Sequence, residues 1–214
     1  MAWLLGAAVL LAVAAYFVRG RLLKALAGWW VVTDQLIPTE AVVVLPGNSP
    51  RTNCLRRAIQ LRYTKWVQLI VLVDSDSTPE ASISGSMKAE ALKQGVPLPP
   101  FLVARQEDPF SVIGFLRLRD FLRQHHLSDL ILVTPSLYTR RAYLLSGTLW
   151  IPHGIRLWIC PVPDPVFRIA GWWETHAGRT AALKEVAEVA NTWWELRRIR
   201  WEESRLPTGL GGGP

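Results

Sequence analysis

The segment Leu130–Ala142 constrains the fold more than any other part of this chain. Its first four residues form an apolar run of strand type that ends at Thr134. A polar turn follows, and then a helical pattern with Arg140 and Arg141 in its first turn. In an open α/β sheet, ligands bind at the carboxyl ends of strands, beside helix N-termini. The segment therefore predicts an α/β fold with two arginines where an anionic ligand could bind.

Strands and helices are predicted to alternate along most of the chain. An apolar run typical of a strand buried on both faces lies at residues 41–45, and a second buried strand is predicted at residues 67–73. Further strands are predicted at residues 101–103, 130–133 and 155–160. Helical patterns lie at residues 51–61, 82–94, 112–124 and 180–200. This alternation predicts crossover units and a Rossmann-like, mostly parallel sheet flanked by helices.

Residues 2–18 form an uncharged, mostly apolar run, which predicts an N-terminal transmembrane helix in contact with the lipid bilayer. The run is slightly short of the ~20 residues of a typical spanning helix. Neither the positive start nor the cleavage site of a signal peptide is clear, so we expect a retained anchor. Three regions follow from this: a membrane anchor with its juxtamembrane segment (1–32), an α/β domain (33–205) and a flexible Gly- and Pro-rich tail (206–214).

The charge of the chain bears on its partners and on its orientation in the membrane. There are 24 Lys and Arg residues against 17 Asp and Glu, which gives a net charge of +7. These basic residues are spread along the chain without a nucleic-acid-binding module, so we expect no nucleic-acid partner. Arg19, Arg21 and Lys24 directly follow the apolar run, and the positive-inside rule would place the domain in the cytoplasm.

The chain is rich in tryptophan. Six of its 11 tryptophans form the doublets Trp29-Trp30, Trp172-Trp173 and Trp193-Trp194. Tryptophan concentrates at membrane–water interfaces, where both an apolar ring and an N–H donor are accommodated. It also fills cores and the interfaces between protein subunits, so the sequence leaves both interpretations open. Other membrane-protein subunits are possible partners for such surfaces.

Two cysteines, Cys54 and Cys160, have no metal-ligand spacing. We predict buried thiols rather than a disulfide, because free cysteine is commonly a core residue. The pair His125-His126 has no carboxylate or cysteine at ligand spacing. The sequence therefore predicts neither a metal site nor a cofactor.

Polar turns follow the first two predicted strands. After the first strand, Gly47, Asn48 and Ser49 could cradle a phosphate with backbone N–H groups, or form an ordinary strand-to-helix turn. After the second strand, Asp74 and Asp76 could bind a cation or a hydroxyl, or serve in acid–base chemistry. The same residues also make a good turn and helix cap.

The turn after the fourth strand holds the strongest cluster of candidate ligand-binding residues: Thr134, Ser136, Tyr138 and Arg141. Arg141 could bind a phosphate or carboxylate with two parallel hydrogen bonds. It could equally pair within the protein with Glu185 or Glu188. Tyr138 can donate a hydrogen bond, but it is a poor proton shuttle near neutral pH because an unperturbed tyrosine has a pKa of about 10.

Four segments together carry a resemblance to a known family. They are AVVVLPGN (41–48), RAIQL (57–61), Met87 with GVP (95–97), and VTPSLYTRRA (133–142). In this order they resemble the SanA/YdcF/ElyC-like family of bacterial envelope-associated proteins, in which the last segment reads V-T-S-x-x-H-x-x-R-A. The resemblance implies an α/β fold and a domain outside the cytoplasm, the orientation that we slightly favour. Gly47, Thr134 and Arg141 match the family's pattern.

The departures from this family bear on activity. Tyr138 stands in place of the family's turn histidine, Cys54 in place of an arginine, and only Gly47 remains of the first turn's glycines. Most acid–base positions are thus replaced, so a divergent, non-catalytic member is expected. Such a protein would be an accessory or structural subunit of a membrane complex, or would bind an anionic envelope metabolite. The alternative is an envelope-biogenesis hydrolase or transferase, acting on a phosphorylated or lipid-linked substrate through Asp74 or Asp76.

Overall fold

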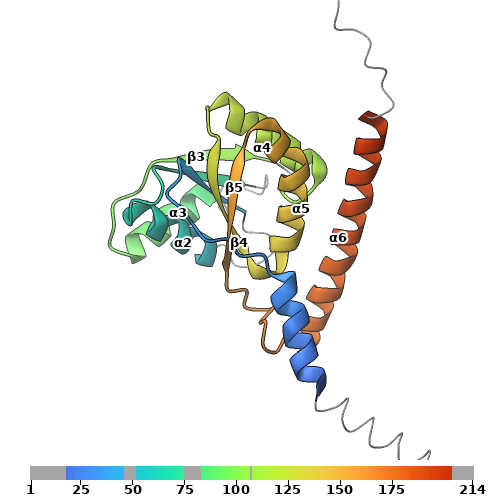
Figure 1. Ribbon diagram of the computed structural model, residues 1–214. Helices are drawn as coiled ribbons and strands as arrows, with labels where there is room; N and C mark the ends of the chain where they lie inside the picture. The colour runs from blue at the N-terminus through green and yellow to red at the C-terminus, as the bar shows by residue number, and fades with distance from the viewer. Residues whose placement is uncertain (1–17, 46–51, 75–82, 107, 204–214) are drawn as a thin grey trace, which may run out of the picture.

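The computed structural model describes residues 18–45, 52–74, 83–106 and 108–203. A five-stranded sheet with the strand order β3-β2-β1-β4-β5 forms its centre (Figure 1). The strands are β1 (Ala41–Val44), β2 (Leu69–Asp74), β3 (Phe101–Arg105), β4 (Asp129–Pro135) and β5 (Arg156–Val162). All neighbouring strands pair in parallel, which confirms the predicted α/β fold.

The central strand β1 explains why the sheet is parallel and covered on both faces. All four of its side chains are fully buried. Its first residue, Ala41, aligns with Leu69 of β2 and with Leu130 of β4. A strand with apolar side chains on both faces is stable only when helices cover each face, as crossover helices do in a parallel sheet.

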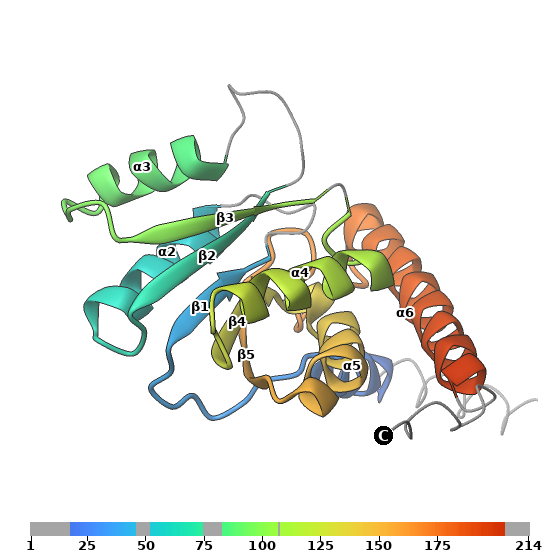
Figure 2. The ribbon, with the colours of Figure 1, turned by 90° about the horizontal axis from the view of Figure 1, so that it is seen from above.

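Helices lie on both faces of the sheet, as Figure 2 shows. The helices α2 (Thr52–Tyr63) and α3 (Ile83–Lys93) cover one face. The helices α4 (Val112–Gln124) and α5 (Thr139–Leu149) cover the other. The predicted ranges for α2, α3 and α4 agree with these bounds within two residues, and α5 begins where a helical pattern was predicted.

The last helix, α6 (His176–Glu203), is longer than the predicted range of 180–200. It packs beside α5 along one stripe of its surface. The buried members of this stripe are Gly178, Ala182, Glu185, Thr192 and Leu196, which lie three, four or seven positions apart. This spacing places them on one face of the helix. A Cβ atom on Gly178 would lie 2.3 Å from the backbone oxygen of Trp172, so the start of α6 requires glycine.

A further helix, formed by residues 18–30, packs against the domain rather than standing apart from it (Figure 1). The indole of Trp30 donates to the oxygen of Leu137 at 2.9 Å, and the indole of Trp172 donates to the oxygen of Leu23 at 3.3 Å. Two of the tryptophan doublets therefore contribute internal contacts. The predicted anchor, apart from Val18, lies outside the described residues. Among the helices that are described, none is long and apolar enough to cross a membrane.

Candidate functional site

The order of the strands identifies the edge of the sheet where a ligand site is expected. β2 and β3 lie on one side of β1, and β4 and β5 lie on the other, so the direction of winding reverses between β1 and β4. In open α/β sheets the carboxyl ends of the strands at such a reversal form the usual binding crevice. Thr134 lies at this edge. Gly47, Asn48, Ser49 and Asp76, which were also predicted to contribute, lie outside the described residues.

Thr134 is fully buried near the carboxyl end of β4. Its hydroxyl has no hydrogen-bond partner within the part of the chain that the structure describes. Most buried hydroxyl groups in proteins are hydrogen-bonded, so this one is a candidate contact for a small ligand.

The turn after β4 supports the helix of residues 18–30 instead of remaining open. Ser136, Leu137 and Tyr138 form a single 3₁₀ turn, and all three are buried. The Thr139 hydroxyl donates to the oxygen of Ser136 at 2.9 Å and accepts from the backbone N–H of Val32 at 3.0 Å. Together with the Trp30–Leu137 bond, these contacts place the turn beneath the incoming chain.

Arg141 is held by an internal ion pair. Its Nε and Nη2 atoms donate to the two carboxylate oxygens of Glu185 at 3.0 and 2.8 Å. A second carboxylate, that of Glu188, lies 3.5 Å away. The guanidinium also lies over the rings of Phe110 and Tyr138, at 5.1 and 5.8 Å from their centroids. Of the two roles predicted for Arg141, these contacts support the internal one, in which it fastens α6 to α5.

The neighbouring arginine is engaged as well. Arg140 donates to the backbone oxygen of Trp29, and its guanidinium lies 4.5 Å from the centre of the Trp29 ring. The two arginines that suggested an anion site therefore bind two other segments of the same chain. Arg140 contacts the helix of residues 18–30, and Arg141 contacts α6.

The carboxyl group of Glu185 has a raised pKa. Burial raises its pKa to about 7, although the adjacent Arg141 lowers it. A folded-state pKa above the unfolded value means that Glu185 takes up a proton on folding between about pH 4.5 and 7. Its contribution to stability is therefore fully present below pH 4.5 and is lost as the pH rises through 7.

The raised pKa of Glu185 leads to a prediction for the variant Glu185→Gln. The wild-type free energy of unfolding should fall between pH 5 and 7, with a slope from this group of at most about 1.4 kcal/mol per pH unit. The variant lacks the titrating carboxyl and should show a shallower decline. Urea unfolding of both proteins at half-unit pH intervals measures the difference. Parallel pH profiles would show that Glu185 does not titrate in this range.

Asp74 lies apart from the cluster around β4. It is buried at the end of β2, where its backbone oxygen accepts from the N–H of Gln106 at 2.8 Å. Side chains alternate between the faces of a strand, so Asp74 is directed to the same face as Leu72, beneath α2 and α3. By the same rule Thr134 shares the face of Leu132, beneath α4 and α5. The sheet therefore separates these two candidate residues.

The two cysteines are free and buried, as predicted. Burial, with further contributions from Asp164 and Cys160, raises the pKa of Cys54 to about 12. The Nε of Arg57 donates to the sulfur of Cys160 at 3.4 Å. A thiol with so high a pKa carries almost no thiolate at neutral pH, so Cys54 is not suited to nucleophilic chemistry.

Comparison with known proteins does not assign this chain to a family. No family model matches the chain, and no curated protein matches it either. The resemblance to the SanA/YdcF/ElyC-like family therefore stays a prediction.

Sequence reasoning missed the partners of the turn, Trp30 and Val32, because they lie 107 residues before the groups that they contact.

Proposed function

We propose that this chain is a non-catalytic accessory subunit of a membrane complex, and that it binds its partner through an apolar surface on α6 and residues 18–30. We call this the outer surface. Its members are Leu22, Leu26, Trp29, Leu183, Val186, Trp193 and Trp194, each between 44% and 70% exposed.

The exposure of this surface is the observation that carries the proposal. Leu183, Val186 and Trp193 are separated by three and seven positions, so they form an exposed stripe of α6 that borders the face packed on the domain. Large contiguous apolar surfaces are rare on soluble monomers and usually mark a site of interaction.

The two parts of the outer surface are joined where the helices meet. Leu26 and Val186, each about half exposed, line one small cavity together with Trp30, Ala182 and Trp172. On the helix of residues 18–30, Leu22, Leu26 and Trp29 lie four and three positions apart and thus share a face. A partner helix lying along α6 would bury both stripes, because apolar stripes of this spacing match the ridges and grooves of another helix.

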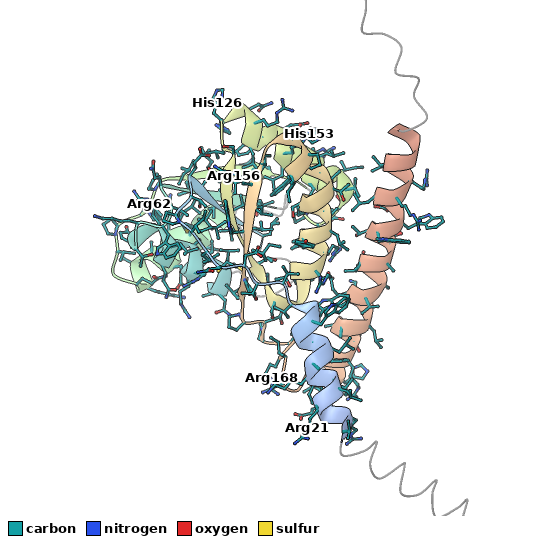
Figure 3. All side chains as sticks on the ribbon, viewed as in Figure 1. Arg21, Arg62, His126, His153, Arg156 and Arg168 are labelled. Atoms are coloured by element: carbon teal, nitrogen blue, oxygen red, sulfur yellow. The ribbon has the colours of Figure 1, made fainter. Side chains whose placement is uncertain are left out.

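A membrane setting follows from the sequence that precedes this surface. Residues 2–18 are uncharged and mostly apolar, and we propose that they anchor the chain in the bilayer. Figure 3 places Arg21 and Arg168 at the same end of the molecule, where the described chain begins. Basic side chains at this end would favour an anionic lipid surface. The anchor would then hold the outer surface near other membrane proteins.

The contacts of Arg141 favour an accessory role over the binding of an anionic metabolite at the turn after β4. An arginine that already forms two hydrogen bonds with a buried glutamate must give them up to bind a ligand. The Trp29 contact engages Arg140 in the same way.

The proposal predicts that polar substitutions on the outer surface release the partner. In cells producing the double variant Leu183→Ser/Trp194→Ser, chemical cross-linking before extraction should recover at least about tenfold less partner. A loss of about 1.4 kcal/mol in the free energy of binding is enough to weaken the affinity tenfold. Both side chains are exposed, so the domain should stay folded.

A matched control is available on the opposite side of the sheet. Leu92 on α3 is 81% exposed and lies outside the outer surface. Leu92→Ser should leave the yield of cross-linked partner unchanged. An equal yield from both variants would refute the outer surface as the binding site.

A further inference from the structure

The outer edge of strand β3 is an interaction surface that the proposed function does not use. β3 is the last strand on its side of the sheet, and Figure 2 shows it at the margin. Two hydrogen bonds show which backbone groups point inward to β2. The N–H of Gln106 donates to the oxygen of Asp74 at 2.8 Å, and the oxygen of Pro100 accepts from the N–H of Ile70 at 3.2 Å. Backbone groups alternate in direction along a strand, so those of the even-numbered residues between Pro100 and Gln106 also point to β2.

The backbone groups of Phe101, Val103 and Arg105 therefore point away from the sheet. None of their N–H groups donates a hydrogen bond to any residue that the structure describes. An edge strand with unpaired N–H and carbonyl groups is a template on which another strand can pair. Proteins often block such an edge with proline or lysine, and residues 101–105 contain neither.

The opposite edge of the same sheet is blocked. The backbone N–H of Asp34 donates to the oxygen of Ile159 in β5 at 3.1 Å, and the Asp34 carboxylate accepts from the Ile159 N–H at 2.7 Å. Two residues further along this edge, Pro161 has no N–H to offer. The protein therefore prevents strand pairing at β5 and, within the part of the chain that the structure describes, has no equivalent device at β3.

We infer that β3 pairs in the antiparallel direction with β3 of a second copy of this chain, with Val103 of each copy at a two-fold axis. In this register the N–H of each Val103 donates to the Val103 oxygen of the other copy. Phe101 of one copy lies opposite Arg105 of the other, and the two residues also exchange hydrogen bonds. Every outward N–H of both strands then has an acceptor, because directly opposed residues of an antiparallel pair bond in this way. The same surface is used on both copies, as in most homodimers.

The side chains of β3 suit pairing with a second copy of the same strand. Phe101 and Val103 are partly buried against the core beneath α2 and α3, and Arg105 is directed to the same face of the sheet. The guanidinium of Arg105 lies opposite the ring of Phe101 of the second copy, which is a favourable cross-strand contact. No like charges face each other, since Arg105 is the only charged residue from 101 to 105. This complementarity favours a second copy over an unrelated strand.

Proline at position 103 tests the pairing without removing a bond to β2. For the full chain purified in detergent, light scattering should give the protein mass of a dimer that dissociates on dilution. Val103→Pro removes the outward N–H at the two-fold axis and should weaken the dimer by about tenfold or more. Val103→Thr keeps that N–H and a β-branched side chain, so it should dimerise as the wild type does. A wild type that stays monomeric at its highest soluble concentration, or equal affinities of these two variants, would overturn the inference.

Cysteine substitutions test the register, even if the proline variant does not fold. Opposed residues that exchange hydrogen bonds have Cα atoms about 5.5 Å apart, which a disulfide can bridge. Oxidation with copper phenanthroline should therefore link Val103→Cys into a covalent dimer. Leu102→Cys should link far less, because Leu102 lies opposite Ala104 of the second copy and not opposite itself. The wild type should not link, since Cys54 and Cys160 are buried. Equal linking of the two cysteine variants would contradict the proposed register.

The edge of β3 shares no residue with the outer surface, so the two interactions can fail separately. The double variant Leu183→Ser/Trp194→Ser, purified in detergent, should still dimerise with the affinity of the wild type. Loss of the dimer in this variant would show that the outer surface joins the two copies, and it would contradict pairing through β3.

Discussion

Replacing Arg141 with alanine should lower the free energy of unfolding by about 3 kcal/mol, because it leaves the buried carboxylate of Glu185 without its partner. The pair joins α5 to α6, with the Arg141 side chain 12% exposed and that of Glu185 3% exposed. Equilibrium unfolding in urea at pH 8 measures the effect. The defect should shrink at pH 5, where Glu185 is protonated and no longer needs a counter-charge.

Two variants serve as controls for Arg141→Ala. Arg140→Ala removes a neighbouring arginine whose contacts to Trp29 are more exposed, and it should cost less than about 1 kcal/mol. The double variant Arg141→Met/Glu185→Leu removes both charges and should be more stable than Arg141→Ala alone. If Arg141→Ala were as stable as the wild type, Arg141 would not fasten α6, and a ligand-binding role would become the better interpretation.

Trp150→Ala should be at least as damaging, lowering the free energy of unfolding by about 4 kcal/mol. Trp150 follows α5 and is fully buried. Its ring stacks on Phe115 of α4 with 4.8 Å between centroids, and its indole N–H donates to the backbone oxygen of Phe115 at 2.8 Å. Truncation would open a large cavity between the two helices and leave that oxygen without its donor.

Trp150→Phe isolates the hydrogen bond from the packing. Phenylalanine keeps an aromatic ring but cannot donate, so a smaller loss of about 1–2 kcal/mol is expected. Both variants can be compared by thermal unfolding followed by circular dichroism. Equal losses for alanine and phenylalanine would show that the aromatic packing contributes little to the α4–α5 contact.

The fold was largely predictable because its strands have an unambiguous pattern. The runs at residues 41–45 and 130–133 are apolar on both faces, and in a chain that also alternates with helices such runs indicate a parallel sheet. The helix at 112–124 was predicted at its observed bounds, because its apolar face repeats at helical spacing. Local patterns of this kind carry their own structural signal.

The candidate site was less predictable because its key interactions join distant parts of the chain. The order of Arg140, Arg141 and the preceding turn indicated the end of a strand, which is where the structure places them. Whether Arg141 binds a ligand or Glu185 depends on how α6 packs, and Glu185 lies 44 residues away. The sequence offered both partners without a means of choosing.

The packing of residues 18–30 against the domain also could not be predicted from the sequence. The sequence assigned them to the juxtamembrane segment of the membrane anchor (1–32). The packing of Trp30 against Leu137, and of Leu23 against Trp172, depends on contacts across 107 and 149 residues. Hydropathy measures only how apolar a segment is, so it cannot distinguish burial in lipid from burial against protein.

Gentle detergent extraction of the native membrane, followed by sizing of the native particle, tests the proposed accessory role most directly. We predict a stable assembly much larger than the chain, which has a mass of 24.0 kDa. The Leu183→Ser/Trp194→Ser variant should leave that assembly, and Leu92→Ser should remain in it. Recovery of the wild-type chain as a lone 24.0 kDa species with its detergent would contradict the proposal.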